Sequence, residues 1–153
     1  MGAKAERAKA LFQQGYNCAQ SVAVAFAPEM GLSEETAARL ASAFGGGMGR
    51  MREVCGAVSG MLLVAGMLYG YSDPTSREEK RETYALVQRL AARFRQENGS
   101  IVCRELLGLA RPEGIPQAEA RTPEYYKKRP CPELVALAAQ ILEEWLAEHP
   151  ARL

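Results

Sequence analysis

An uncharged and strongly apolar stretch at residues 54–71 limits what this chain can fold into. Its length only reaches the lower edge of what a membrane-spanning helix needs. Glycines interrupt it repeatedly, and the segments on either side follow the pattern of ordinary amphipathic helices. We therefore expect a buried central helix against which the other helices pack, and no insertion into a membrane.

Helix signals follow one another along the rest of the chain, and no segment alternates with period two for long enough to form a strand. Asn17 and Gln20 have the spacing of a capping box, as do Ser76 and Glu79. The expected helices are 3–14, 17–26, 33–44, 54–71, 76–96, 100–108 and 132–145. The proline-rich segment 110–130 is predicted to be an irregular wrapping segment, which is often functional when it is this long.

The size of the chain fits one folded unit. Its 153 residues are 48% hydrophobic, which is enough to bury a single core without disulfides. We predict an all-α fold, with residues 1–153 forming one domain. It should be a bundle of about six or seven helices around the central helix at 54–71.

Charge and histidine content exclude several functions. The 19 basic and 18 acidic residues leave a formal charge of +1, which gives no electrostatic footprint for nucleic acid. His149 is the single histidine and lies near the end of the chain, so histidine-based catalysis is nearly excluded. The first residues lack the apolar region of a signal peptide, so we expect a cytoplasmic protein. Structural disulfides are rare in that compartment.

The sequence contains four widely spaced cysteines, Cys18, Cys55, Cys103 and Cys131. No C-x-x-C motif is present, so neither a zinc ribbon nor a thioredoxin-type motif is indicated. Each cysteine nevertheless falls in the first turn of an expected helix, where free N–H groups and partial positive charge favour the thiolate. We expect all four to be redox-active thiols or metal ligands that converge on one site. Inert burial, which is common for free cysteine, is the alternative.

A glycine-rich loop leads the chain to Cys55. Successive glycines allow backbone N–H groups to form a nest for an anion, and Arg50 and Arg52 would add positive charge. A simple connection between helices is the alternative. The candidate cofactor-binding residues are Gly45, Gly46, Gly47, Gly49, Arg50 and Gly56.

Two further expectations concern the residues after the loop. Because of the glycine nest and its arginines, we expect Cys55 to be the most thiolate-like of the four cysteines. Gly56 and Gly60 lie one helical turn apart. Glycine destabilises a helix, so this pair predicts that another segment packs closely against that face.

The motif Cys55-Gly56-Ala57-Val58-Ser59-Gly60, with one cysteine before it and two after it, resembles the redox-active family known by its C_GCAxxG_C_C pattern. The resemblance covers about residues 8–145 and includes Cys18, Cys103 and Cys131 in order. It implies a role in electron transfer or thiol redox chemistry. Similar domains occur in redox proteins that carry haem or iron–sulfur groups, but this sequence has no C-x-x-C-H motif for haem attachment.

Three functions remain open at this point. We favour ligation of an iron–sulfur cluster by the four cysteines, most simply a [2Fe–2S] centre. The second is a cofactor-free thiol–disulfide protein that cycles two cysteine pairs, for which three connectivities exist. The third is a helical interaction module with inert thiols. Either redox function implies a redox partner protein, and the sequence leaves the formation of a homo-oligomer open.

Overall fold

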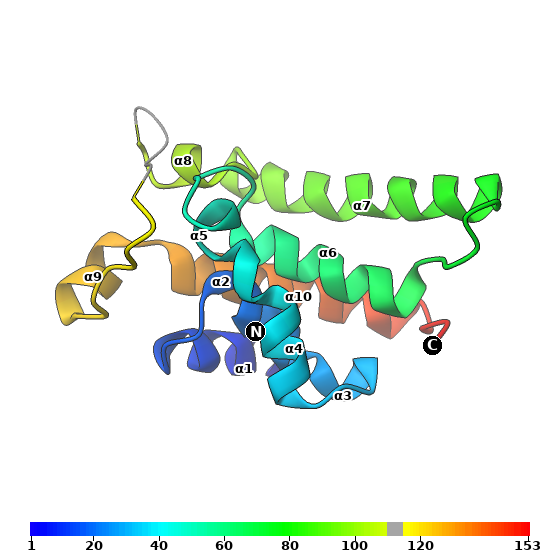
Figure 1. The fold of residues 1–153 in the computed structure, drawn as a ribbon, viewed down its shortest axis with the longest axis horizontal. Coiled ribbons are helices and arrows are strands. Elements are labelled where there is room, and N and C mark those ends of the chain that lie inside the picture. Colours follow the sequence, from blue (N-terminus) through cyan, green and yellow to red (C-terminus); the bar gives the residue numbers. More distant parts are fainter. Residues whose placement is uncertain (110–114) are drawn as a thin grey trace.

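The computed structural model describes residues 1–109 and 115–153, which contain helices and no β-strand. The elements in chain order are α1 (Ala3–Gln13), α2 (Cys18–Ala25), α3 (Ala27–Met30), α4 (Glu34–Ala41), η1 (Ser42–Phe44), α5 (Gly45–Met48), α6 (Gly56–Tyr69), α7 (Arg77–Asn98), α8 (Cys103–Leu106), α9 (Pro123–Lys128) and α10 (Cys131–Glu148) (Figure 1). Six helices of the described part have at least seven residues. The predicted all-α fold is therefore confirmed.

The central helix is α6, which begins two residues later than the start of the predicted stretch. Of its 14 residues, nine are buried, including Val58, Met61, Val64 and Leu68. Helix α6 packs against α2, α7 and α10, and Figure 1 shows it running between α7 and α10. A helix that is apolar on all sides requires this position, because it has no face that favours water.

The remaining long helices complete the core around α6. Helix α1 packs against α10 and α2, and α2 also packs against α4. Phe12 of α1, Phe94 of α7 and Phe26, which lies between α2 and α3, are fully buried in this core. The amphipathic helices therefore pack their apolar faces around one shared hydrophobic core.

Local sequence signals account for where several helices begin. Asn17 accepts a hydrogen bond from the Gln20 N–H at 2.9 Å, and the Gln20 side chain accepts one from the Asn17 N–H, so the predicted capping box is confirmed. Ser33 and Ser76 also cap their helices with side-chain oxygens. These caps satisfy N–H groups that the first helical turn leaves without a partner.

The structure corrects two sequence expectations. Residues 115–122 are irregular as predicted, but α9 follows them, capped by Thr122 and started by Pro123. The predicted helix at 100–108 is shorter, because Val102 pairs with Val54 in an isolated antiparallel bridge and α8 begins only after it. Residues 110–114 of the predicted wrapping segment lie outside the described residues.

Across the described ranges, no helix combines the length and the apolar character that crossing a membrane would require.

Candidate functional site

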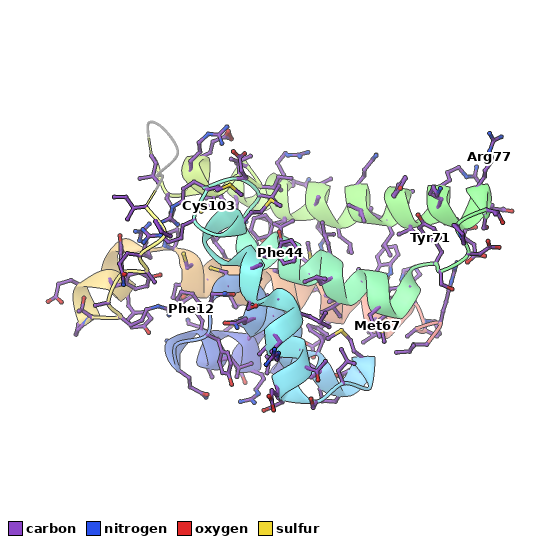
Figure 2. All side chains as sticks on the ribbon, in the orientation of Figure 1. Phe12, Phe44, Met67, Tyr71, Arg77 and Cys103 are labelled. Atoms are coloured by element: carbon purple, nitrogen blue, oxygen red, sulfur yellow. The ribbon has the colours of Figure 1, made fainter. Side chains whose placement is uncertain are left out.

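Every cysteine lies at the N-terminus of a helix, as predicted. Cys18, Cys103 and Cys131 are the first residues of α2, α8 and α10, and Cys55 is the N-cap residue of α6. In Figure 1, α5, α8 and α9 gather with the start of α10 at one end of the molecule. Figure 2 places Cys103 and Phe12 at this end, opposite Tyr71 and Arg77.

All four cysteines are free and line one cavity of about 390 Å³, which we call the thiol cavity. Cys55 and Cys103 are buried, with 4% and 8% of their surface exposed, whereas Cys18 and Cys131 are partly exposed. The cavity size is typical of a small-molecule site. The cysteines that are far apart in the sequence therefore share one pocket.

Backbone hydrogen bonds hold Cys55 and Cys103 beside each other. The Cys55 N–H donates to the Ile101 carbonyl at 2.7 Å, and the Cys103 N–H donates to the Glu53 carbonyl at 2.6 Å. These bonds flank the Val54–Val102 bridge. In this antiparallel register the two cysteines are diagonal neighbours on one face, about 7–8 Å apart at their Cα atoms.

The glycine loop (residues 45–50) has an unusual backbone. Five consecutive residues, 46–50, have φ between 66° and 72°, and two of them are not glycine. L-amino acids avoid this left-handed region at a cost of about 1–2 kcal/mol each. The surrounding contacts must therefore stabilise the loop. Such strain often accompanies functional sites.

Close packing explains one glycine of this loop. A Cβ atom on Gly47 would lie 2.6 Å from the Cβ of Cys103 and 2.9 Å from the Cα of Arg52. Gly47 therefore lets the loop lie directly against Cys103. All six predicted cofactor-binding residues line the thiol cavity: Gly45, Gly46, Gly47, Gly49, Arg50 and Gly56.

Several N–H groups at and just after the end of the glycine loop donate to carbonyls of the loop itself, so they are not available to an anion. The N–H groups of Gly49 and Arg50 both donate to the Gly45 carbonyl, at 3.0 and 3.3 Å. The N–H groups of Arg52 and Glu53 donate to carbonyls of the same loop. The loop thus satisfies these donors itself, which an isolated stretch of sequence could not reveal.

Gly56 and Gly60 permit the close packing that was predicted. A Cβ on Gly56 would lie 3.0 Å from the Cβ of Cys18, and one on Gly60 would lie 2.6 Å from the carbonyl oxygen of Ala19. The start of α2 therefore packs directly on α6. This contact places Cys18 at the same cavity as Cys55.

Positive charge surrounds the thiol cavity. Among its described lining residues are four arginines, Arg50, Arg52, Arg121 and Arg129, and one acidic residue, Glu119. Arg129 and Glu119 form an ion pair at 2.5 Å. The nearly neutral chain thus concentrates basic side chains at its cysteines.

Arg121 fixes the irregular segment to α1. Its guanidinium donates to the carbonyls of Phe12 and Tyr16 at 2.8 and 3.0 Å, and it lies 4.2 Å from the centre of the Phe12 ring. Carbonyls at the end of a helix attract such a cation. Sequence reasoning missed Arg121, Arg129 and Glu119. The only signal for them was the length of the segment 110–130.

Cys18 and Cys131 form a hydrogen-bonded pair. The Cys18 thiol donates to the Cys131 sulfur, and this contact holds the pKa of Cys131 below the ordinary value of 9.0 despite burial. The nearby charges of Arg129, Arg52 and Arg121 lower the pKa of Cys131 further. The same hydrogen bond, together with burial, raises the pKa of Cys18 well above 9.0. Cys131 is therefore the more acidic thiol of the pair.

The expectation that Cys55 is the most thiolate-like cysteine is wrong. Burial raises the pKa of Cys55 from 9.0 to about 12, although the N–H groups of Ala57 and Val58 act in the opposite direction. Burial also raises the pKa of Cys103, and Arg52 opposes that rise. Desolvation disfavours the charged thiolate more than the helix N-terminus favours it.

The predicted metal site is not formed by the side chains of the described residues. Within residues 1–109 and 115–153, no group of three or more His, Cys, Asp or Glu side chains is placed to hold a metal ion. The present arrangement therefore does not fit a ready set of four cluster ligands.

The fold and the site together define a small all-helical protein with four free thiols around one basic cavity. The chain belongs to the family described as "Putative redox-active protein (C_GCAxxG_C_C)", whose model matches residues 16–145. No curated protein and no solved structure matches the chain. Membership of a redox-active family agrees with the predicted redox role.

Proposed function

We propose that the protein is a thiol–disulfide redox protein that works without a resident cofactor, with Cys18 and Cys131 as its reactive pair. The observation that carries this proposal is the hydrogen bond from the Cys18 thiol to the Cys131 sulfur. A direct contact between two sulfur-bearing side chains is the arrangement from which a disulfide forms with least movement. Both residues are less buried than Cys55 and Cys103, and both line the thiol cavity.

The two cysteines would have different tasks. Cys131, whose pKa is lowered, supplies the thiolate that attacks one sulfur of a disulfide R–S–S–R. This step forms a mixed disulfide and releases one RS⁻. Cys18 then loses its proton and attacks the Cys131 sulfur, which releases the second RS⁻. The protein gains a Cys18–Cys131 disulfide, and the substrate is reduced to two thiols.

Cys55 and Cys103 would take no direct part in this exchange. Both are buried, with 4% and 8% of their surface exposed, so a substrate disulfide has less access to them than to Cys131. As diagonal neighbours across the bridge they would also need backbone movement before they could form a disulfide. In this proposal they pack the rear wall of the thiol cavity.

Iron–sulfur ligation, as a [2Fe–2S] centre held by Cys18, Cys55, Cys103 and Cys131, is the second candidate. The observation in its favour is that all four cysteines line the same cavity. It requires the four side chains to move together into one ligand set, because the described residues hold no group arranged for a metal.

The four single Cys→Ser variants separate these functions. Each variant is purified without oxygen, analysed for iron and sulfide, and then treated with a small disulfide while its free thiols are counted. We expect no bound iron, and we expect Cys18→Ser and Cys131→Ser to lose the protein disulfide. Cys55→Ser and Cys103→Ser should still form it, with peptide mapping locating it between Cys18 and Cys131.

Other outcomes would identify the competing functions. Iron in the parent that is lost equally in all four variants would support the cluster, because four ligands act as one chelating unit. If the parent protein binds no iron and keeps four free thiols under oxidising conditions, both redox functions are excluded. A helical interaction module with inert thiols then remains. Alkylation supplies an independent check, since Cys131 should react first at neutral pH.

A further inference from the structure

We infer that the thiol cavity accepts a small disulfide compound bearing carboxylate groups, and that Arg129 binds one of those carboxylates. This inference rests on the proposed function and names its substrate class. The cavity volume of about 390 Å³ suits a small molecule rather than a folded partner. The substrate sulfur would lie at Cys131, two residues along the chain from Arg129.

The charge of the cavity selects the substrate class. Its described lining residues include four arginines but only one carboxylate. A pocket lined by one sign of charge raises the local concentration of ligands of the opposite sign. A dicarboxylate disulfide is therefore favoured over a neutral one, and a diammonium disulfide is disfavoured.

Glu119 shows where such a carboxylate would bind. Its Oε1 lies 2.5 Å from Nη2 of Arg129, and both residues line the cavity. The Glu119 side chain is 45% exposed and that of Arg129 is 14% exposed. A carboxylate already occupies the arginine, and it comes from the irregular segment rather than from a helix. We assign Glu119 as a built-in competitor that a substrate carboxylate displaces.

The other arginines near Cys131 are held by the protein itself. Arg121 is committed to the carbonyls of Phe12 and Tyr16. Arg52 is buried and donates to Cys103. Both contribute positive charge, whereas Arg129 has a carboxylate partner that is partly exposed and can be exchanged.

Alkylation with two reagents tests the inference without any redox step. Iodoacetate is anionic and iodoacetamide is neutral, and both react with the same thiolate of Cys131. The ratio of their rate constants therefore reports the local charge and cancels any change in the pKa of Cys131. We expect Arg129→Gln to lower this ratio by about threefold or more, and Glu119→Gln to raise it by a similar factor. Arg77→Gln is the matched control, because it removes one positive charge at the far end of the molecule (Figure 2) and should leave the ratio unchanged.

A series of small disulfides tests the substrate class itself. Dithiodiglycolate, 2-hydroxyethyl disulfide and cystamine present the same bond with negative, neutral and positive groups. Each rate constant is divided by that of the same disulfide with 2-mercaptoethanol, because the leaving thiols differ in pKa. On this relative scale we expect dithiodiglycolate to oxidise the protein fastest and cystamine slowest, with the difference shrinking as salt is added.

The two proposals fail in different ways. If Arg129→Gln and Arg77→Gln give the same alkylation ratio as the parent, or if cystamine reacts fastest, the anionic substrate class is wrong. If the alkylation ratio changes as expected but no disulfide forms between Cys18 and Cys131, the proposed function fails while the anion-binding cavity stands.

Discussion

Arg52 Nη1 lies 3.6 Å from the Sγ of Cys103 and donates a hydrogen bond to it, although the two residues are far apart in the sequence. Both are buried, with 6% and 8% of their surface exposed. The backbone bonds around the Val54–Val102 bridge bring them together. A cation donating to a buried sulfur stabilises its thiolate, so this contact limits how far burial raises the pKa of Cys103.

Replacement of Arg52 should therefore make Cys103 a weaker acid. In Arg52→Gln we expect a higher pKa for Cys103 than in the parent protein, because both the charge and the charged donor are lost. Arg52→Lys keeps the charge and should give an intermediate value. Titration of ¹³Cβ-labelled cysteines by NMR measures this directly. Identical titration of Cys103 in all three proteins would contradict the role assigned to the contact.

Gly47 and Gly49 provide a matched pair in the glycine loop. Both have positive φ, but an added Cβ meets Cys103 at 2.6 Å from Gly47 and only the Ala43 carbonyl at 3.7 Å from Gly49. Gly49→Ala should lose about 1–2 kcal/mol of stability from backbone strain alone. Gly47→Ala should lose a further 1 kcal/mol or more, because atoms must shift. Urea unfolding of the two variants gives the difference, and equal losses would show that the loop does not pack tightly on Cys103.

Helix α6 provides a second matched pair. A Cβ at Gly60 would lie 2.6 Å from the Ala19 carbonyl oxygen, whereas one at Gly66 would meet nothing within 4 Å. Gly60→Ala should destabilise the protein by about 1–3 kcal/mol through the forced separation of α2 and α6. Gly66→Ala should stabilise it by up to about 1 kcal/mol through helix propensity. Thermal unfolding measures both, and a stabilised Gly60→Ala protein would contradict the packing described.

The raised pKa of Cys55 predicts a pH dependence of stability. An unfolded cysteine ionises near 9.0, whereas Cys55 in the folded protein ionises at about 12. Between these values the unfolded state binds fewer protons, so the free energy of unfolding falls as pH rises. One such group contributes a slope of about 1.4 kcal/mol per pH unit. The contribution is fully present below pH 9.

Cys55→Ala should remove this contribution. Denaturant unfolding of reduced protein at several values between pH 8 and pH 11 should give a steeper decline in the parent than in the variant. Cys18, Cys103 and Tyr125 also have raised pKa values and remain in both proteins, so the difference in slope isolates Cys55. Parallel curves would indicate that Cys55 is not desolvated in solution.

The sequence by itself determined the long helices and placed the thiols at helix starts. The Asn17–Gln20 capping box and the apolar stretch of α6 act through neighbours only a few residues away. For the same reason, each cysteine could be assigned to the start of a helix before any tertiary contact was known. The close approach predicted at Gly56 and Gly60 was also local in origin, because a helix accepts two glycines on one face when something packs there.

Only the tertiary structure decided which thiol has the lowered pKa. Thiolate stability depends on burial and on hydrogen-bond partners, and for Cys131 those partners come from α2 and from arginines elsewhere in the chain. The positive charge beside Cys55 in the sequence pointed to the wrong residue, because packing buries Cys55 at the start of α6. The Arg129–Glu119 pair likewise depends on an irregular segment with no periodic pattern. Where a helix begins depends on residues that are close together in the sequence. The pKa of a buried thiol depends on all the groups that surround it in the folded structure.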